Sequence, residues 1–352
     1  MSGPEVSGPP GAGSAGAGPE LSGPERFDRY VERCLYDPIS GFYAAHGQAG
    51  GSRGDFLTSP EVGPLFGHLI GRYLDTVWRD LGEPAPFTVV ECGAGRGTLA
   101  RAVLSSAPEC LAALDYVCVE RSERLRADAR DLLGESAGGA VVVCGSLEEV
   151  EAPFVGVVMA NELLDNLAFR LVVRDAAEGW AEVFVVDGAP VLGEFDGSGG
   201  PIDVDAPAGT RLPLQDEAAS WVRDALERLE AGRLLIIDYG VATTAELIGR
   251  DWLRTYRGHD RGSDPFETPG SCDITTDVAF DQLPAATSLR TQAQFLADLG
   301  IDELVAEGKA LWNERAHLGD LAAIKARSRI VEAEGLTDPH SLGAFLVAEW
   351  VV

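Results

Sequence analysis

The segment Thr88–Leu99 constrains the fold of this chain more than any other part of the sequence. An apolar, strand-like stretch runs into three glycines at alternate positions, Gly93, Gly95 and Gly97, and then into residues with a helical pattern. Glycines allow a tight turn and let a ligand approach the backbone, while the N-terminus of the helix presents free N–H groups. This order predicts a ligand-binding turn in a parallel α/β sheet, with a purely structural turn as the simpler alternative.

The rest of the chain supports such a sheet. Beyond residue 86, apolar strand patterns alternate with helical ones, which is typical of an α/β fold. Strands are expected at Phe87–Cys92, Tyr116–Glu120, Val141–Cys144, Val155–Ala160 and Arg233–Asp238, with Ser341–Trp350 as a last edge strand. Helices are expected at Ser59–Trp78, Arg101–Leu114, Arg121–Leu133, Asp216–Leu229, Thr291–Leu299 and residues 303–334. Between residues 170 and 195, short β-rich segments around turns predict an antiparallel meander inserted into the sheet.

The chain divides into three predicted regions. Residues 1–24 contain seven Gly and five Pro, and we expect a disordered tail because so few apolar side chains cannot offset the chain entropy. Residues 25–85 are expected to form a helical cap, and residues 86–352 a binding domain with insertions at about 170–215 and 241–290. The second insertion has no regular periodicity and is too long for a plain connector, so we expect either a functional or a disordered loop there.

The formal net charge of −28 limits the partners of the chain. Nucleic acids and anionic membranes attract positive charge and are disfavoured, whereas a basic partner is favoured; simple solubility is the alternative. The six cysteines show no metal-binding spacing with the five histidines, so no metal is expected. Cysteines in apolar runs, no membrane-length apolar stretch and no leader pattern lead us to expect a cytoplasmic protein.

Two acidic residues stand at positions where a cofactor would lie. Glu91 precedes Gly93 by two positions, and Glu-x-Gly-x-Gly-x-Gly resembles motif I of the class I S-adenosylmethionine (SAM) methyltransferases, in which the acid holds the methionine end of the cofactor. Thr98 occupies the last glycine position of the dinucleotide fingerprint, which counts against an NAD-dependent dehydrogenase. Glu120 ends the next strand and could accept hydrogen bonds from ribose hydroxyls, although any charged residue can end a strand.

Residues after the third and fourth strands complete the candidate site. Ser146 and Leu147 fall where an adenine edge would lie. Asn161, Glu162 and Asp165 follow the fourth strand and should border the methyl group. On a helical turn, Glu162 and Asp165 would share a face and could grip a guanidinium; alternatively, the two acids only favour a helix N-terminus through its dipole.

Further segments resemble the MidA-like methyltransferases, a family that includes the mitochondrial arginine methyltransferase that assists complex I assembly. The matching segments are Leu35–Tyr43, Gly54–Glu61, Glu91–Leu99, Asn161–Asp165, Asp238–Gly240, Tyr256–His259, Asp273–Thr275 and Thr291–Leu296. The resemblance implies a Rossmann-like class I methyltransferase sheet with a helical N-terminal region and an antiparallel β insertion, and SAM as cofactor. It also implies that the segment with Thr58 and Ser59 closes over the cofactor and the methyl acceptor. The chain departs from the family at residues 166–169 and 277–280, where an acceptor would sit.

Together these features predict a SAM-dependent methyltransferase whose acceptor is a nitrogen atom, first of all that of an arginine side chain in a protein or peptide. Glu162 and Asp165 would orient the guanidinium for in-line transfer, and His259 or Asp238 would receive the proton. Two alternatives stay open: a small molecule or modified peptide of specialised metabolism as the acceptor, and a SAM-binding assembly factor without turnover. The oligomeric state also stays open, with a homodimer among the options.

Overall fold

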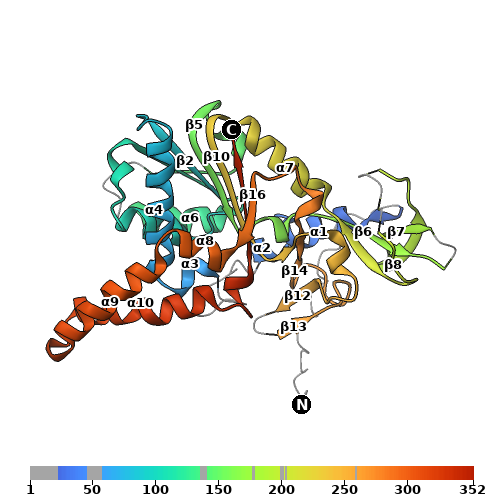
Figure 1. Ribbon diagram of the computed structural model, residues 1–352. Helices are drawn as coiled ribbons and strands as arrows, with labels where there is room; N and C mark the ends of the chain where they lie inside the picture. The colour runs from blue at the N-terminus through green and yellow to red at the C-terminus, as the bar shows by residue number, and fades with distance from the viewer. Residues whose placement is uncertain are drawn as a thin grey trace, which may run out of the picture.

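The computed structural model describes residues 23–45, 58–134, 141–176, 179–198, 202, 204–257 and 260–352. A central sheet with helices on both faces forms the body of the protein, and two smaller β regions lie beside it (Figure 1). The predicted α/β class with an antiparallel β insertion is therefore confirmed. The predicted disordered tail, residues 1–24, lies almost entirely outside the described residues.

Seven strands form the central sheet in the order β16-β17-β10-β5-β2-β3-β4. Their bounds are β2 Phe87–Cys92, β3 Leu114–Val119, β4 Val142–Cys144, β5 Phe154–Asn161, β10 Leu229–Asp238, β16 Ser288–Thr291 and β17 Leu346–Val351. Strand β17 runs antiparallel to both of its neighbours, and the other pairs are parallel. The chain first moves outward from β2 to β3 and β4, and later continues on the opposite side of β2 with β5 and β10. Ligands bind outside the carboxyl ends of the strands where the order reverses in this way.

Helices bury their apolar faces against both sides of this sheet. On one side lie α4 Pro64–Asp80, α5 Thr98–Ser105, α6 Glu123–Gly134 and α8 Gln292–Asp298. On the other side lies α7 Asp216–Glu227, through Ala218, Val222 and Ala225. Helix α4 belongs to the region predicted as an N-terminal cap, but its side chains pack in the core of the sheet.

Two long helices form a hairpin that extends away from the sheet (Figure 1). Helix α9 spans Ile301–Arg315 and α10 spans Leu321–Thr337. The base of the hairpin is tied to the body, because the buried Glu332 carboxylate accepts a hydrogen bond from the Leu65 N–H at 2.9 Å. This contact ties α10 to the start of α4.

The N-terminal helix and the predicted meander share a separate core. Helix α1 Phe27–Tyr36, with the short α2 Phe42–Ala45 behind it, packs against an antiparallel sheet. The strands of that sheet are β1 Glu25–Arg26, β6 Arg170–Arg174, β7 Trp180–Val186, β8 Ala189–Glu194 and β9 Arg211–Leu214. A buried pair between Arg170 and Glu182, 2.7 Å apart, crosslinks β6 and β7.

The region 241–290, which has no periodicity in sequence, contains short strands rather than an irregular loop. They are β11 Gly240–Val241, β12 Leu253–Arg257, β13 Asp260–Gly262, β14 Asp273–Thr276 and β15 Val278–Ala279. Strand β12 pairs with both β13 and β14. Strand β14 is buried on both faces, although three of its four side chains, Asp273, Thr275 and Thr276, are polar. Hydrophobic alternation, the usual strand signal, is therefore absent from the sequence.

The predicted helix 303–334 forms two helices, α9 and α10, because the chain turns at Gly319, whose φ is +59°. Prolines and one late strand explain three further differences from the sequence prediction. The predicted helix 59–78 breaks into α3 Ser59–Val62 and α4 at Gly63, because the residue before Pro64 is disfavoured in a helix. Helix α5 ends before Pro108 for the same reason. Strand β17 is not an edge strand, because β16 pairs with its outer side. Among the described residues, no helix is long and apolar enough to cross a membrane.

Candidate functional site

A cavity of about 430 Å³ opens at the carboxyl ends of β2, β3 and β5, where the strand order reverses. The cavity has two sides, named here the turn side and the Glu162 side. The turn side consists of Glu91, Gly95, Glu120, Ser146 and Leu147, and the Glu162 side consists of Tyr36, Tyr43, Glu61, Asn161, Glu162 and Asn166. Sequence reasoning places a ligand at this edge of the sheet, and the cavity lies there.

The glycine turn leaves open space at one position. Gly93, Gly95 and Gly97 all adopt left-handed backbone angles, with φ of +70°, +54° and +77°. A Cβ atom at Gly93 or Gly97 would press on Leu163 or Leu133, at 3.2 and 3.0 Å. A Cβ atom at Gly95 would meet no atom within 4 Å. Gly93 and Gly95 both line the cavity, and Gly95 is the one with open space at its Cβ position, where a ligand can approach the chain.

Glu120 ties the turn to the end of β3. Its carboxylate accepts hydrogen bonds from the N–H groups of Gly95, at 2.9 Å, and of Ser122, at 2.7 Å. Burial raises the pKa of Glu120, and these backbone donors oppose that shift. Each carboxylate oxygen has a second lone pair, so the group can still accept hydrogen bonds from a ligand.

Glu91 lines the turn side and is buried beside Tyr116, whose hydroxyl donates a hydrogen bond to the Glu91 carboxylate at 2.5 Å. Burial raises the pKa of Glu91 to about 7. The group is therefore poised between its charged and neutral forms at neutral pH. A cationic group bound in the cavity would favour the charged form.

Glu162 directly follows β5 in a strained conformation. Its φ is +54°, an uncommon value for a residue other than glycine, and its N–H donates to the Ile237 carbonyl of β10 at 2.8 Å. The Asn161 amide donates to one Glu162 oxygen at 3.0 Å. Burial and then the nearby Asp165 raise the pKa of Glu162 to about 8. Strain of this kind persists only where the surroundings hold it, and it is frequent at functional sites.

Asp165 and Asp238 lie behind the cavity wall and do not line it. Asp238 accepts hydrogen bonds from the N–H groups of Leu164 and Tyr239, both at 2.9 Å, and so fixes the turn after Glu162. Asp165 accepts a hydrogen bond from the Tyr239 hydroxyl at 2.5 Å, and burial raises its pKa to about 6. Asp165 lies in a single 3-10 turn, Leu164–Asn166, and Glu162 lies before it, so the expected shared helical face is not formed.

The other predicted site residues have varied positions. Thr58 lines the cavity, whereas Ser59 is buried and its hydroxyl donates to the Gln292 side chain at 2.9 Å. Gly97 does not line the cavity. His259 and residues 54–57 of the closing segment lie outside the described residues.

Tyr36, Tyr43 and Asn166 are among the cavity residues that were not predicted as site residues. Tyr36 and Tyr43 stack with their ring centres 5.3 Å apart, and their hydroxyls donate to the Asn166 carbonyl at 3.2 Å and to the Asn166 side chain at 3.0 Å. The Asn166 amide in turn donates to Asp273 at 3.1 Å. Asn166 was noted as a departure from the family pattern, but nothing in the sequence connects it with Tyr43, 123 residues away.

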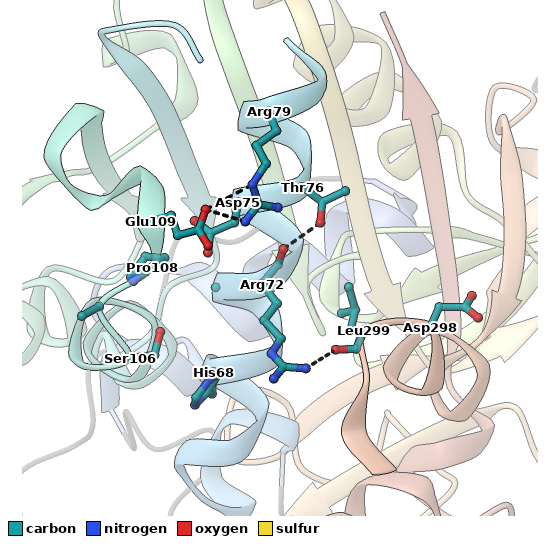
Figure 2. Close-up of a pocket in the computed structure, with 12 residues that line it drawn as sticks. His68, Arg72, Asp75, Thr76, Arg79, Ser106, Pro108, Glu109, Asp298 and Leu299 are labelled. Atoms are coloured by element: carbon teal, nitrogen blue, oxygen red, sulfur yellow. Dashed lines mark hydrogen bonds and ion pairs between the residues drawn. The ribbon is translucent and has the colours of Figure 1, made fainter. Parts of the chain in front are cut away.

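A second hollow, of about 410 Å³, lies on the outer side of α4 (Figure 2). Its charged side chains already have partners. Arg72 donates to the Leu299 carbonyl at 3.1 Å, and Arg79 pairs with Glu109 at 2.6 Å. None of the predicted site residues lines it.

Comparisons with known proteins find a family model and a solved structure that match this chain. The model of the family described as S-adenosyl-L-methionine-dependent methyltransferase matches residues 69–297. The crystal structure of a protein from Burkholderia thailandensis bound to S-adenosyl-homocysteine matches this fold with a TM-score of 0.75 and 30% sequence identity. The match covers 94% of this chain and 88% of that chain.

Curated relatives carry more specific names. The protein arginine methyltransferase NDUFAF7 homolog of Drosophila melanogaster is 32% identical over 71% of this chain and 64% of its own length. Protein arginine methyltransferase NDUFAF7 of Danio rerio is 28% identical over 78% of this chain and 72% of its own length. This chain thus spans less than two thirds of the Drosophila relative. Both relatives are named as mitochondrial proteins, and the predicted cytoplasmic location is wrong on that evidence.

Proposed function

Because this chain belongs to the family of S-adenosyl-L-methionine-dependent methyltransferases, we propose that it transfers a methyl group to the guanidinium of an arginine side chain in a protein or peptide. The cofactor is SAM, whose sulfonium supplies the methyl group when bound. The relatives named as protein arginine methyltransferases support this acceptor. The chemistry of the Glu162 side supports it independently.

The residues of the turn side fit the cofactor. Gly95 offers the open backbone position, and Glu120 has unused lone pairs for a pair of ribose hydroxyls. Glu91 would face the cationic methionine end, which would favour the charged form of this buried acid. Ser146 and Leu147 would border the adenine. These five residues would hold SAM against the carboxyl end of the sheet.

The observation that carries the choice of arginine is a set of buried oxygen atoms without donors. Glu162 Oε2 and Asn161 Oδ1 are buried and have no hydrogen-bond partner among the described residues. Leaving such atoms unpaired costs free energy, so a ligand that supplies N–H groups is favoured. A guanidinium carries five N–H donors and no acceptor, which makes it the complementary group.

Glu162 would orient the guanidinium and take its proton. In its charged form, Glu162 would accept N–H hydrogen bonds and draw the positive charge of the guanidinium toward the nitrogens that it contacts, which keeps the lone pair of the reacting nitrogen available for the methyl group. As that nitrogen gains a methyl group it loses an N–H proton, and Glu162 would receive it at Oε2. Asp238 was predicted as an alternative base, but three backbone N–H groups already occupy it, and we assign it a positioning role.

The proposal can be tested with methyl-labelled SAM and an extract of the source organism. We expect label in the protein fraction, released as methylated arginine after acid hydrolysis. Label only in small molecules would keep the methyltransferase and overturn the arginine acceptor. It would instead favour an acceptor from specialised metabolism, selected by the altered residues 166–169.

A further inference from the structure

Glu61 brings a second carboxylate to the Glu162 side of the cavity. It lies in the first turn of α3, on a segment 101 residues before Glu162, and it lines the same cavity. The charge of Glu61 contributes to raising the pKa of Glu162, so the two carboxyl groups lie within electrostatic reach of each other.

Glu61, like Glu162, has one carboxylate oxygen without a donor among the described residues. Its Oε2 atom is buried and has no hydrogen-bond partner among the described residues. The described part of the cavity thus carries unpaired oxygens from two carboxylates and one amide, at Glu61, Glu162 and Asn161, all from residues that line it. A set of oxygens alone can be a solvated acidic surface, but these three atoms are buried.

The segment that carries Glu61 is firmly held. The Ser59 hydroxyl donates to Gln292, and the Gln292 amide donates to the Leu336 carbonyl at 3.0 Å, which connects α3 to α8 and α10. Glu332 of α10 holds the N–H of Leu65 just beyond. The position of Glu61 is thus set by contacts outside the cavity, as expected for a side chain that must be placed before a ligand arrives.

We propose that Glu61 and Glu162 form a clamp of two carboxylates that selects a guanidinium over an ammonium group. This inference rests on the proposed arginine acceptor and adds the residue that makes the site specific for it. A planar guanidinium can offer separate N–H edges to two carboxylates held on different elements. A compact ammonium group offers its three donors from a single nitrogen, and would leave the buried Oε2 atom of one of the two carboxylates without a donor, which is costly.

The test uses the full chain with bound S-adenosyl-homocysteine and two small cations as probes. Ethylguanidinium chloride and ethylammonium chloride are titrated at equal ionic strength, and apparent affinities are taken from the rise in melting temperature. The wild-type chain, Glu61→Gln and Glu123→Gln are compared. Glu123 is a matched control, because it is also a glutamate in the first turn of a helix but is exposed and does not line the cavity.

We expect the wild-type chain and Glu123→Gln to bind ethylguanidinium at least tenfold more tightly than ethylammonium, and Glu61→Gln to lose most of that preference. Glu61→Asp, which keeps the charge, should retain part of it and guards against a misfolded Gln variant. No preference in the wild-type chain would overturn the arginine acceptor and the clamp together. A wild-type preference that survives in Glu61→Gln within twofold would overturn the clamp alone.

Discussion

The turn side and the Glu162 side of the cavity present different chemical groups. On the turn side, the key groups are a left-handed backbone at Gly95 and a carboxylate, Glu120, that already holds two backbone N–H groups. On the Glu162 side, the key groups are side-chain oxygens, and those of Glu61, Asn161 and Glu162 include atoms without donors in the described part of the chain. The backbone of the turn side is thus paired within the chain, whereas three buried oxygens of the Glu162 side have no donor there.

Under the proposed function, this difference would let one cavity hold a constant cofactor and a selected acceptor. A backbone turn satisfied by its own chain recognises its ligand mainly by shape and open space. Unpaired buried oxygens recognise their ligand by the donors that it brings, and they penalise a ligand that brings too few. Variants on the turn side should therefore change the binding of SAM, and variants on the Glu162 side should change kcat or kcat/KM for the acceptor.

The largest effect is expected at Glu162. Glu162→Gln should lower kcat about 10²- to 10³-fold, because it removes the charge that orients the guanidinium and the base that takes its proton. The SAM dissociation constant should stay within about twofold of the wild-type value. Methyl transfer to extract protein and calorimetric SAM binding measure the two effects. Equal losses in both would mean that Glu162 belongs to the cofactor side.

A smaller effect is expected at the glycine turn, and it should appear in SAM binding rather than in kcat. Gly95→Ala should weaken SAM binding about tenfold, because an alanine in the left-handed region costs about 1–2 kcal/mol and its Cβ enters the space where the cofactor approaches. The control is Gly209→Ala, since Gly209 also has a positive φ, +85°, and open space around it but lies outside the cavity. If both variants bind SAM equally well, Gly95 does not contact the cofactor.

Two tyrosines allow a matched comparison of the sides. The hydroxyls of Tyr239 and Tyr116 each donate to a buried carboxylate at 2.5 Å, Asp165 near Glu162 and Glu91 on the turn side. Tyr239→Phe should lower kcat/KM for the acceptor severalfold, and Tyr116→Phe should instead raise KM for SAM severalfold. Steady-state kinetics with each substrate varied in turn measure both. If Tyr239→Phe and Tyr116→Phe both changed only kcat/KM for the acceptor, or both changed only KM for SAM, the division into two sides would be contradicted.

The pH dependence of Tyr239→Phe sharpens this comparison. With the pKa of Glu162 at about 8, kcat/KM for the acceptor should rise with pH up to about that value. The Tyr239 hydrogen bond lowers the pKa of Asp165, so its loss leaves Asp165 protonated over a wider range. A neutral Asp165 no longer disfavours the charged form of Glu162, and the rise in kcat/KM should move to lower pH. A shift to higher pH would contradict this coupling.

The smallest effect concerns stability without ligand. The pKa of Glu162 is higher in the folded chain, about 8, than its ordinary value of 4.5, so its contribution to stability is present below about pH 4.5 and is lost as the pH rises through 8. The melting temperature should therefore fall between about pH 5 and 8, and it should fall by a few degrees less in Glu162→Gln. Scanning calorimetry of both chains over this range measures the difference.

The sequence predicted the turn side much better than the Glu162 side. Gly95, Glu91 and Glu120 lie in or near one strand–turn–helix unit, and local spacing alone brings them to one edge of the sheet. The contacts of Asn166 and Asp165 depend on Tyr43 and Tyr239, which come from distant segments. Glu61 lies in the segment Gly54–Glu61, which already stands out in the sequence. The burial of its Oε2 atom, without a donor among the described residues, is visible only in the folded chain.

Local conformation also limited the prediction. A helical spacing of three suggested that Glu162 and Asp165 act as a pair, but the left-handed φ of Glu162 separates them into a cavity residue and a buried support. Sequence patterns assume ordinary backbone angles, so a strained residue at a functional position escapes them. The polar strand β14 escaped prediction for a related reason, since its buried side chains are hydrogen-bonding groups rather than apolar ones.

The most direct test of the two-sided cavity is a crystal structure of the chain with S-adenosyl-homocysteine and ethylguanidinium bound together. We expect the ribose hydroxyls within hydrogen-bond distance of Glu120 and the ethylguanidinium between the carboxylates of Glu61 and Glu162. An ethylguanidinium bound elsewhere, with Glu61 and Glu162 facing only water, would contradict the account.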